Sequence, residues 1–294
     1  MRYETSAELS DPNSLGEDLL RSVALVFDIA KQHCNDCGGY HLRYVVGRTV
    51  RTEASVNYDR IELIARLETE LKSIAAHRNG GLEILIPGSA DTGLLATCAH
   101  TAQRLGPEVS RRTKFTVLDI CRTPLLLCQA FAERHGISLK VDQVDLNYPR
   151  GEHAADVIVV HSLLRYLHPE NHVKFLAALA RWLRPGGKII LSNRLQEGLS
   201  NKRKSHIAGL MQKVSAGELT LPVDVCEIIE ALREPPDPPA TLERAEDLRQ
   251  LIAEAGLQID AEDIVDKERR PEDILLAPEL SRAVRYVAVL SRPD

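Results

Sequence analysis

Residues 83–96 read EILIPGSADTGLLA, and this stretch decides the fold. The apolar run 84–86 is typical of a short buried strand, small and turn-forming residues follow it, and residues 94–96 are compatible with a helix. A helix that begins directly after such a turn offers unpaired N–H groups and a partial positive charge, which suit a carboxylate or a phosphate. The segment therefore predicts a strand, a ligand-binding turn and a helix.

The same alternation of strand and helix continues along the chain. Apolar and β-branched runs predict strands at 82–86, 114–120, 138–146, 156–162, 188–193, 257–265 and 285–293. Helical patterns lie between them, at 92–106, 123–136, 169–187 (with a turn) and 242–256. This order predicts an α/β fold: a doubly wound, mostly parallel seven-stranded Rossmann-like sheet with helices on both faces.

Two helical patterns precede the first strand. One covers 14–32 and begins with a capping box formed by Ser14 and Glu17, and the other covers 57–77 and ends before two glycines. We therefore expect residues 1–79 to form an N-terminal helical cap on a core at 80–294. Residues 195–240 interrupt the alternation and are expected to form a lid insertion, with a solvated basic triplet at 202–204 and a helical segment around 223–233.

Bulk properties argue against several partners. The chain has 294 residues and a formal net charge of -5, so a general attraction to nucleic acid or anionic lipid is not expected. No apolar run approaches the roughly 20 residues that cross a bilayer, and the first residues are polar and acidic, unlike a secretory signal. We expect a cytoplasmic protein without a nucleic-acid or membrane partner, and a homodimer is left open.

Six cysteines are scattered along the chain without the spacing of a disulfide framework. Four of them fall in segments that resemble element interiors and are expected to be buried thiols: Cys98, Cys121, Cys128 and Cys226.

The segment HCNDCGGYH, at 33–41, allows three interpretations. His33, Cys34, Cys37 and His41 have spacings that could ligate zinc, but a second CxxC is absent, so no metal is expected. A helix-breaking turn with two thiols is favoured. In the third interpretation Tyr40, His41 and Arg43 close over an active site and hold a substrate carboxylate or amine.

Acidic residues end two of the predicted strands. In an open parallel sheet, ligands bind beyond the carboxyl ends of the strands, where the strand order reverses. Asp119 ends the second strand and could accept hydrogen bonds from both hydroxyls of a ribose. Asp145 ends the third strand and could accept from an adenine amino group, while the backbone N–H of Leu146 faces a ring nitrogen.

These features together resemble the class I, Rossmann-like S-adenosylmethionine-dependent methyltransferases over roughly residues 80–294. The resemblance is carried by the order and spacing of LIPGSADTG, FTVLDICRTPLLLC, VDQVDL, ADVIVVHSLLRYLHP, LARWLRPGGKIILSN and RYVAVLSRP. It implies S-adenosylmethionine as the cofactor. The residues expected to bind it are Pro87, Gly88, Ser89, Ala90, Asp91, Gly93, Asp119, Ile120, Asp145, Leu146 and His161.

The first crossover departs from the family pattern of an acidic residue followed by three alternate glycines. Pro87 stands in place of the acid, Ser89 and Asp91 stand in place of two glycines, and Gly93 is retained. The Asp91 carboxylate could accept a hydrogen bond from the ammonium group of the cofactor, which predicts a rewired loop.

Residues after the fourth strand are expected to face the reacting methyl group. His161 is a candidate base or substrate contact, although it could simply hydrogen-bond the backbone near the cofactor. Ser162 and Arg165 are candidate substrate contacts, and Tyr40 and His41 are further catalytic candidates.

The function expected from the resemblance is methyl transfer to an oxygen or nitrogen of a small molecule. Two alternatives remain open. The altered loop could support intramolecular cyclisation of the methionine part, giving a cyclic amino acid and methylthioadenosine, or the chain could be a non-catalytic binding protein.

Overall fold

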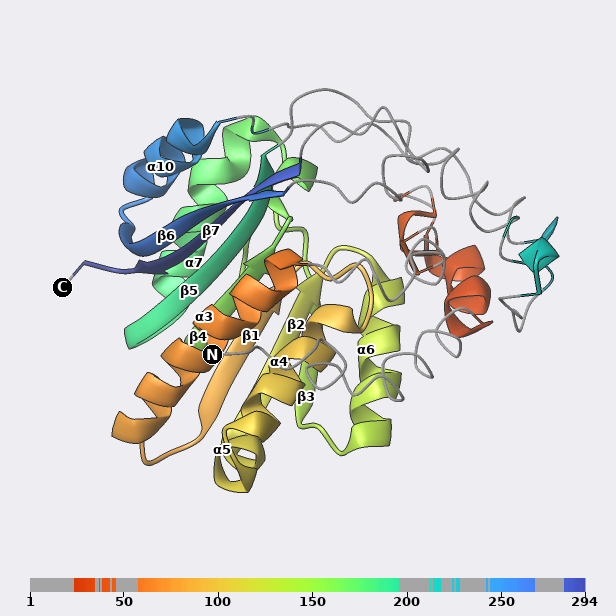
Figure 1. Cartoon of the computed structure of the whole chain (residues 1–294), viewed down its shortest axis with the longest axis horizontal. Helices are drawn as coiled ribbons and strands as arrows, with labels where there is room; N and C mark the ends of the chain where they lie inside the picture. Colours follow the sequence, from red (N-terminus) through yellow and green to blue (C-terminus); the bar gives the residue numbers. More distant parts are fainter. Residues whose placement is uncertain are drawn as a thin grey trace.

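The computed structural model, shown in Figure 1, describes part of the chain. The described residues are 24–34, 37, 39–42, 44–45, 58–195, 212, 214–217, 224, 226–227, 242, 244–267 and 283–293. Several predicted features lie outside them: the capping box at Ser14 and Glu17, the side chain of Arg43, the basic triplet at 202–204 and most of the helical segment around 223–233.

Seven strands form one sheet in the order β3-β2-β1-β4-β5-β7-β6. Their bounds are β1 (Leu82–Pro87), β2 (Thr113–Asp119), β3 (Leu139–Gln143), β4 (Ala155–His161), β5 (Leu183–Leu195), β6 (Gln258–Lys267) and β7 (Ala283–Ser291). The first five strands are parallel, whereas β7 runs antiparallel to both β5 and β6. The predicted doubly wound, mostly parallel sheet is confirmed.

Helices cover both faces of this sheet (Figure 1). The longer ones are α3 (Tyr58–His77), α4 (Gly93–Arg104), α5 (Pro107–Arg112), α6 (Arg122–His135), α7 (His172–Trp182) and α10 (Ala245–Glu254). Two short 3₁₀ helices precede α7: η1 (Leu164–Tyr166) and η2 (Pro169–Asn171). Residues 24–33, 40–42 and 44–45 are also helical. In the part of the chain that the structure describes, no helix is long and apolar enough to cross a membrane.

The core is divided into two layers by the sheet. One layer joins the sheet to α3, α4 and α6, and the other joins it to α7 and α10. Ile84 and Ile86 of β1 belong to the first layer and Leu85 to the second, because successive strand side chains point to opposite faces. This explains why a central strand has a continuous apolar run.

The helix α3 packs on the sheet. Leu63, Leu67 and Leu71 recur at four-residue spacing and are completely buried in the first core layer. Burial of each such side chain contributes about 1.5–3 kcal/mol. The helix predicted at 57–77 is therefore part of the helical layer that covers the sheet.

An ion-pair cluster fixes the amino ends of the strands. The buried carboxylate of Asp156 in β4 lies 2.7 Å from Arg184 and 2.8 Å from Arg78, and it accepts a hydrogen bond from the backbone N–H of Glu83 at 2.8 Å. A shallow hollow lined partly by Glu83, His153 and Arg184 lies beside it. This hollow is at the edge of the sheet opposite the predicted ligand site.

The strand order reverses at β1, which has β2 on one side and β4 on the other. Ligands of open parallel sheets bind at this switch point, beyond the carboxyl ends of the strands. The described residues between Cys34 and Leu42, called the N-terminal segment below, reach the same edge, because Cys34 contacts Thr123 at the start of α6 and His41 contacts Ala90 after β1. Three segments far apart in the sequence thus meet where a ligand is expected.

Candidate functional site

The turn after β1 approaches a neighbouring segment very closely. Pro87 ends β1, and Gly88 has φ +75 and donates its backbone N–H to the carbonyl of Leu118 at 2.7 Å. A Cβ atom placed on Gly88 would lie 2.6 Å from a methyl group of Leu163. The positive φ favours glycine at this position, and an added Cβ would also require the side chain of Leu163 to shift.

The rest of the turn is held by its own polar groups. The hydroxyl of Ser89 donates to the carbonyl of Asp91 at 2.6 Å, and the Asp91 carboxylate accepts the backbone N–H of Gly93 at 2.8 Å. Asp91 is buried, and its carboxylate satisfies the backbone N–H of the first residue of α4. Its predicted contact with the ammonium group of the cofactor stays a prediction.

Asp119 connects the ends of β1 and β2. Its Oδ2 accepts the backbone N–H of Ser89 at 2.9 Å, and its Oδ1 accepts that of Cys121 at 2.8 Å. Burial raises the pKa of the Asp119 carboxyl, against the opposing effect of the His41 imidazole and of these two N–H donors. Because each carboxylate oxygen has a second lone pair, Asp119 retains capacity to accept from ribose hydroxyls.

The flanking positions Ile120, Asp145 and Leu146 are the ones predicted to contact an adenine ring. Ile120 directly follows Asp119, and 55% of its surface is exposed, so its side chain is accessible to a ligand at this edge. At the end of β3, Asp145 accepts the backbone N–H of Asn147 at 2.9 Å, while the side chain of Leu146 is buried. Only the backbone of Leu146 is therefore suited to the contact predicted for it.

The residues after β4 adopt a strained turn. Ser162 has φ +56, a left-handed conformation that is uncommon for residues other than glycine and recurs at functional sites. Its N–H donates to the carbonyl of Ser192 at 2.7 Å, and its hydroxyl accepts from Arg285 of β7. His161, half-buried, ends β4 immediately before this turn.

The N-terminal segment lies beside this turn. The ring of Tyr40 packs edge-on against Tyr166 of η1, with 5.2 Å between ring centroids. In η1, the guanidinium of Arg165 lies 5.5 Å from the ring centroid of Tyr166, and its buried Nε makes no hydrogen bond to the part of the chain described above. Tyr40 and Arg165 thus both lie near the ring of Tyr166, and their predicted role as substrate contacts stays a prediction.

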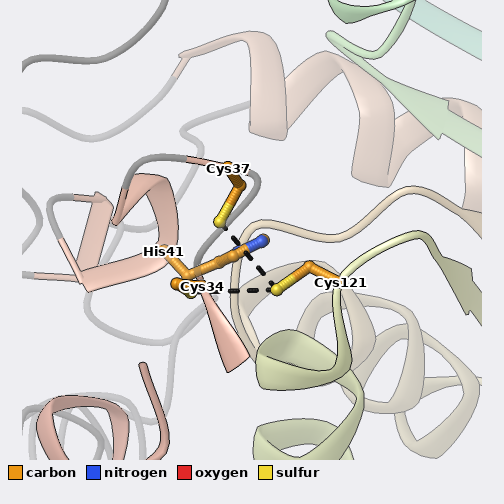
Figure 2. A group of neighbouring side chains, drawn as sticks. All are labelled: Cys34, Cys37, His41 and Cys121. Carbon is orange, nitrogen blue, oxygen red and sulfur yellow. Dashed lines mark hydrogen bonds between the residues drawn. The ribbon is translucent and has the colours of Figure 1, made fainter. Parts of the chain in front are cut away.

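His41 occupies a different environment from Tyr40. Only 4% of its surface is exposed, and its Nδ1 lies 2.8 Å from the carbonyl oxygen of Ala90. The imidazole belongs to a cluster of Cys34, Cys37, His41 and Cys121, whose sulfur and nitrogen atoms all lie within 4.8 Å of one another. Figure 2 shows the imidazole nitrogen directed between the sulfurs of Cys37 and Cys121.

The sequence analysis does not predict that Cys121 belongs to this cluster. Cys121 lies at the start of α6, two residues after Asp119, and not inside an element. His33, a predicted zinc-ligand candidate, is not in the cluster; its carbonyl accepts a weak bond from the Cys121 thiol. Cys98, Cys121 and Cys128 are buried as predicted, whereas the prediction that Cys226 is buried is wrong, because it is exposed.

The hydrogen bonds of the cluster shift the pKa values of its thiols in opposite directions, and the bond with Cys121 raises the pKa of the Cys34 thiol. The hydrogen bond with Cys34 lowers the pKa of the Cys121 thiol, and the bond with Cys121 lowers that of Cys37. Although burial lowers the pKa of the His41 imidazole, the neighbouring thiols and Asp119 raise it well above its usual value.

Comparisons with known proteins agree with this architecture. Residues 96–187 match a family model described as a methyltransferase domain. No curated protein sequence matches the chain. A solved LepI variant in complex with SAH and a substrate analogue is 14% identical, with a TM-score of 0.50 over 86% of this chain and 52% of that one.

Two further solved structures are similar at lower TM-scores. The mitomycin 7-O-methyltransferase MmcR is 14% identical, with a TM-score of 0.47 over 95% of this chain and 67% of that one. A TehB-like S-adenosylmethionine-dependent methyltransferase from Corynebacterium glutamicum is 17% identical, with a TM-score of 0.39 over 76% of this chain and 87% of that one.

The match to the methyltransferase model runs from α4 to the turn that leads into the parallel part of β5, and thus includes the ends of β2, β3 and β4. The sheet order, with its final antiparallel strand, is that of class I methyltransferases. The resemblance found in the motifs is therefore confirmed: residues 96–187 match a methyltransferase domain, and the core has the fold of the class I, Rossmann-like methyltransferases.

Proposed function

We propose that the protein transfers a methyl group from S-adenosylmethionine to an oxygen or nitrogen atom of a small molecule. The observation that carries the proposal is the position of Asp119. Its buried carboxylate lies at the switch point of a methyltransferase-type sheet and connects the turn after β1 to the start of α6. An acid at this place is suited to accept from the ribose hydroxyls of a nucleoside cofactor.

The turn after β1 would hold the methionine part of the cofactor. Gly88 keeps side-chain atoms out of the turn, and the N-terminus of α4 presents backbone N–H groups with a partial positive charge. The adenine would lie against the exposed side chain of Ile120, with Asp145 accepting from its amino group. The chain thus offers a separate group for each part of the cofactor.

S-adenosylmethionine supplies a methyl group that its positively charged sulfur already activates. The protein then has mainly to orient the acceptor in line with that methyl group and to exclude water. His161 at the end of β4 is proposed to accept a proton from an acceptor hydroxyl or amine. Tyr40 and Arg165 are proposed to contact the acceptor, and Ser162 to fix the turn between them.

A small acceptor is proposed because the N-terminal segment lies close to the edge of the sheet where methyl transfer would take place. Tyr40 packs on Tyr166 there, which narrows the approach for a macromolecule. The net charge of -5 also disfavours a nucleic-acid acceptor. The SAH bound to the LepI variant that shares this fold supports the class of cofactor.

Calorimetry with S-adenosylmethionine tests the cofactor site. We expect binding by the full chain, and Asp119→Asn should raise the dissociation constant at least tenfold, which is about 1.4 kcal/mol. Asp260→Asn is the matched control, because Asp260 lies on the edge strand β6 and pairs with Lys188 far from the switch point. Absence of binding by the folded wild-type chain would support a non-catalytic protein instead.

Product analysis tests the reaction. Methyl transfer to a supplied mixture of hydroxyl- and amine-containing small molecules should release S-adenosylhomocysteine and shift an acceptor by the mass of one methylene group. Release of methylthioadenosine without any acceptor would contradict methyl transfer and support intramolecular cyclisation.

A further inference from the structure

The cluster formed by Cys34, Cys37, His41 and Cys121 has the dimensions of a metal site. The sulfur of Cys121 lies 3.7 Å from that of Cys34 and 3.9 Å from that of Cys37. Thiolates bound to zinc at about 2.3 Å in a tetrahedron have sulfurs about 3.8 Å apart. The observed separations therefore match the edges of a coordination tetrahedron.

The donor set indicates which metal would bind. Three sulfurs and one imidazole nitrogen form a soft set that suits zinc, and four protein ligands close the coordination sphere. We propose that Cys34, Cys37, His41 and Cys121 bind a single zinc ion in a closed tetrahedral site. Each thiol gives up its proton to solvent as its sulfur binds the ion, and no oxidant or reductant is involved. No water position is left, so the site stabilises structure.

Neighbouring groups already orient two of the ligands. The Nδ1 of His41 is within hydrogen-bond distance of the carbonyl of Ala90, which accepts its proton and leaves Nε2 to face the sulfurs (Figure 2). The hydroxyl of Thr123 lies 3.1 Å from the sulfur of Cys34. Metal-binding histidines commonly donate their second ring N–H in this way, because the bond fixes the tautomer and the ring orientation.

The position of the cluster gives the ion a role. Three ligands come from residues 34–41, whereas Cys121 comes from the connection between β2 and α6. The ion would therefore attach the N-terminal segment to the sheet edge two residues after Asp119. Through His41 it would also hold the carbonyl of Ala90 in the turn after β1.

A disulfide is the competing use of these thiols. Sulfurs of a disulfide are bonded at about 2.03–2.05 Å, much closer than the 3.7 Å and 3.9 Å observed. Such a bond would require an oxidant, and it would leave the third sulfur and His41 without a shared partner. The arrangement of four donors around a common centre favours an ion.

Metal analysis of the purified full-length protein tests the proposal. We expect about one zinc per chain after expression in zinc-containing medium, and loss of most of it in Cys34→Ser, Cys37→Ser and Cys121→Ser. Two controls should retain zinc: His33→Gln, a histidine of the same segment outside the cluster, and Cys226→Ser, an exposed cysteine. Retention of zinc by the cluster variants, or its loss in the controls, would overturn the assignment.

X-ray absorption at the zinc edge tests the ligands without relying on variants that might misfold. We expect three sulfurs at about 2.3 Å and one nitrogen at about 2.0–2.1 Å. His41→Cys should keep the metal with four sulfurs, whereas His41→Leu should lose it. A reduced protein that takes up neither zinc nor cobalt, or mass spectrometry showing a disulfide within the cluster, would exclude the site.

The zinc site does not depend on the proposed activity. A zinc-loaded protein that fails to bind S-adenosylmethionine would contradict the proposed function and leave the metal site intact. A protein that takes up no zinc but binds S-adenosylmethionine would contradict the metal site and leave the proposed function intact.

Discussion

The Nδ1 atom of His41 lies 2.8 Å from the carbonyl oxygen of Ala90, and these two residues connect the N-terminal segment to the turn after β1. The turn is short and is otherwise held by bonds among Ser89, Asp91 and Asp119. A change at His41 can therefore reach the cofactor site through one hydrogen bond. The proposed metal and the proposed cofactor are coupled by this contact.

Metal removal should loosen both the segment and the turn. After chelation under reducing conditions, we expect the dissociation constant for S-adenosylmethionine to rise about tenfold, or about 1.4 kcal/mol. Proteolysis by trypsin at the exposed Lys31 should become faster, because the helix at 24–33 loses its attachment. Re-addition of zinc should restore both properties.

Calorimetry and timed digestion with gel analysis measure the two effects. Chelator added to the His41→Leu variant serves as the control and should change neither quantity further. If proteolysis accelerates while cofactor affinity stays constant, the Ala90 contact does not transmit the effect.

Asp156 should contribute strongly to stability and little to cofactor binding. Its completely buried carboxylate pairs with Arg78 and Arg184 at the edge opposite the cofactor site. Removal of one partner of a buried ion pair leaves uncompensated charge, so Asp156→Ala should lower the free energy of unfolding by about 3 kcal/mol. Urea denaturation measures this loss.

A matched comparison separates burial from charge in that result. Asp260→Ala breaks the more exposed pair with Lys188 and should cost less than about 1 kcal/mol. Equal losses in the two variants would show that burial of Asp156 does not determine its contribution. Cofactor affinity measured in native buffer should be the same in both.

The sheet could be predicted from the sequence because apolar runs and the glycines that follow helix ends are local signals. The boundaries were less predictable. The prediction placed the fifth strand at 188, but β5 begins at Leu183, because Leu183 pairs with Ala155 ahead of an irregularity in the register. The helix α5 was not predicted, because its six residues PEVSRR have no apolar periodicity.

The candidate site likewise has residues that the sequence predicts and one that only the tertiary fold reveals. Asp119 and Asp145 follow from a general rule about strand ends, so sequence alone places them at one edge. Cys121 is 84 residues from Cys37, and no spacing pattern relates them. Only the position of the end of β2 brings the fourth donor to the N-terminal segment, which is a property of the tertiary fold.

Substitution of Gly88 by a residue with a side chain should lower the stability of the fold. Gly88→Ala places a Cβ at a φ of +75 and 2.6 Å from Leu163, so we expect a loss of about 1–3 kcal/mol in the free energy of unfolding and weaker cofactor binding. Gly136→Ala is the matched control, because Gly136 also has positive φ but has no atom within 4 Å of the added Cβ. Its smaller loss, measured by urea denaturation, gives the cost of the backbone conformation alone.

The double variant Gly88→Ala with Leu163→Ala then isolates the close contact. It should recover part of the affinity for S-adenosylmethionine, since the steric conflict is removed while the backbone strain persists. No recovery would show that the backbone conformation alone excludes alanine.

Asp91 offers a test of what the altered first crossover does. Its carboxylate accepts the N–H of Gly93, so Asp91→Ala should leave this buried donor at the start of α4 unsatisfied and cost about 1–3 kcal/mol of stability. Asp91→Asn keeps an acceptor for that N–H but removes the charge. If the carboxylate also contacts the ammonium group of the cofactor, both variants should bind S-adenosylmethionine at least tenfold more weakly. Asparagine with unchanged affinity would assign Asp91 to the bond with the Gly93 N–H alone. Calorimetry on both variants, with stability measured in parallel, decides between a rewired cofactor contact and a structural replacement of the family's glycines.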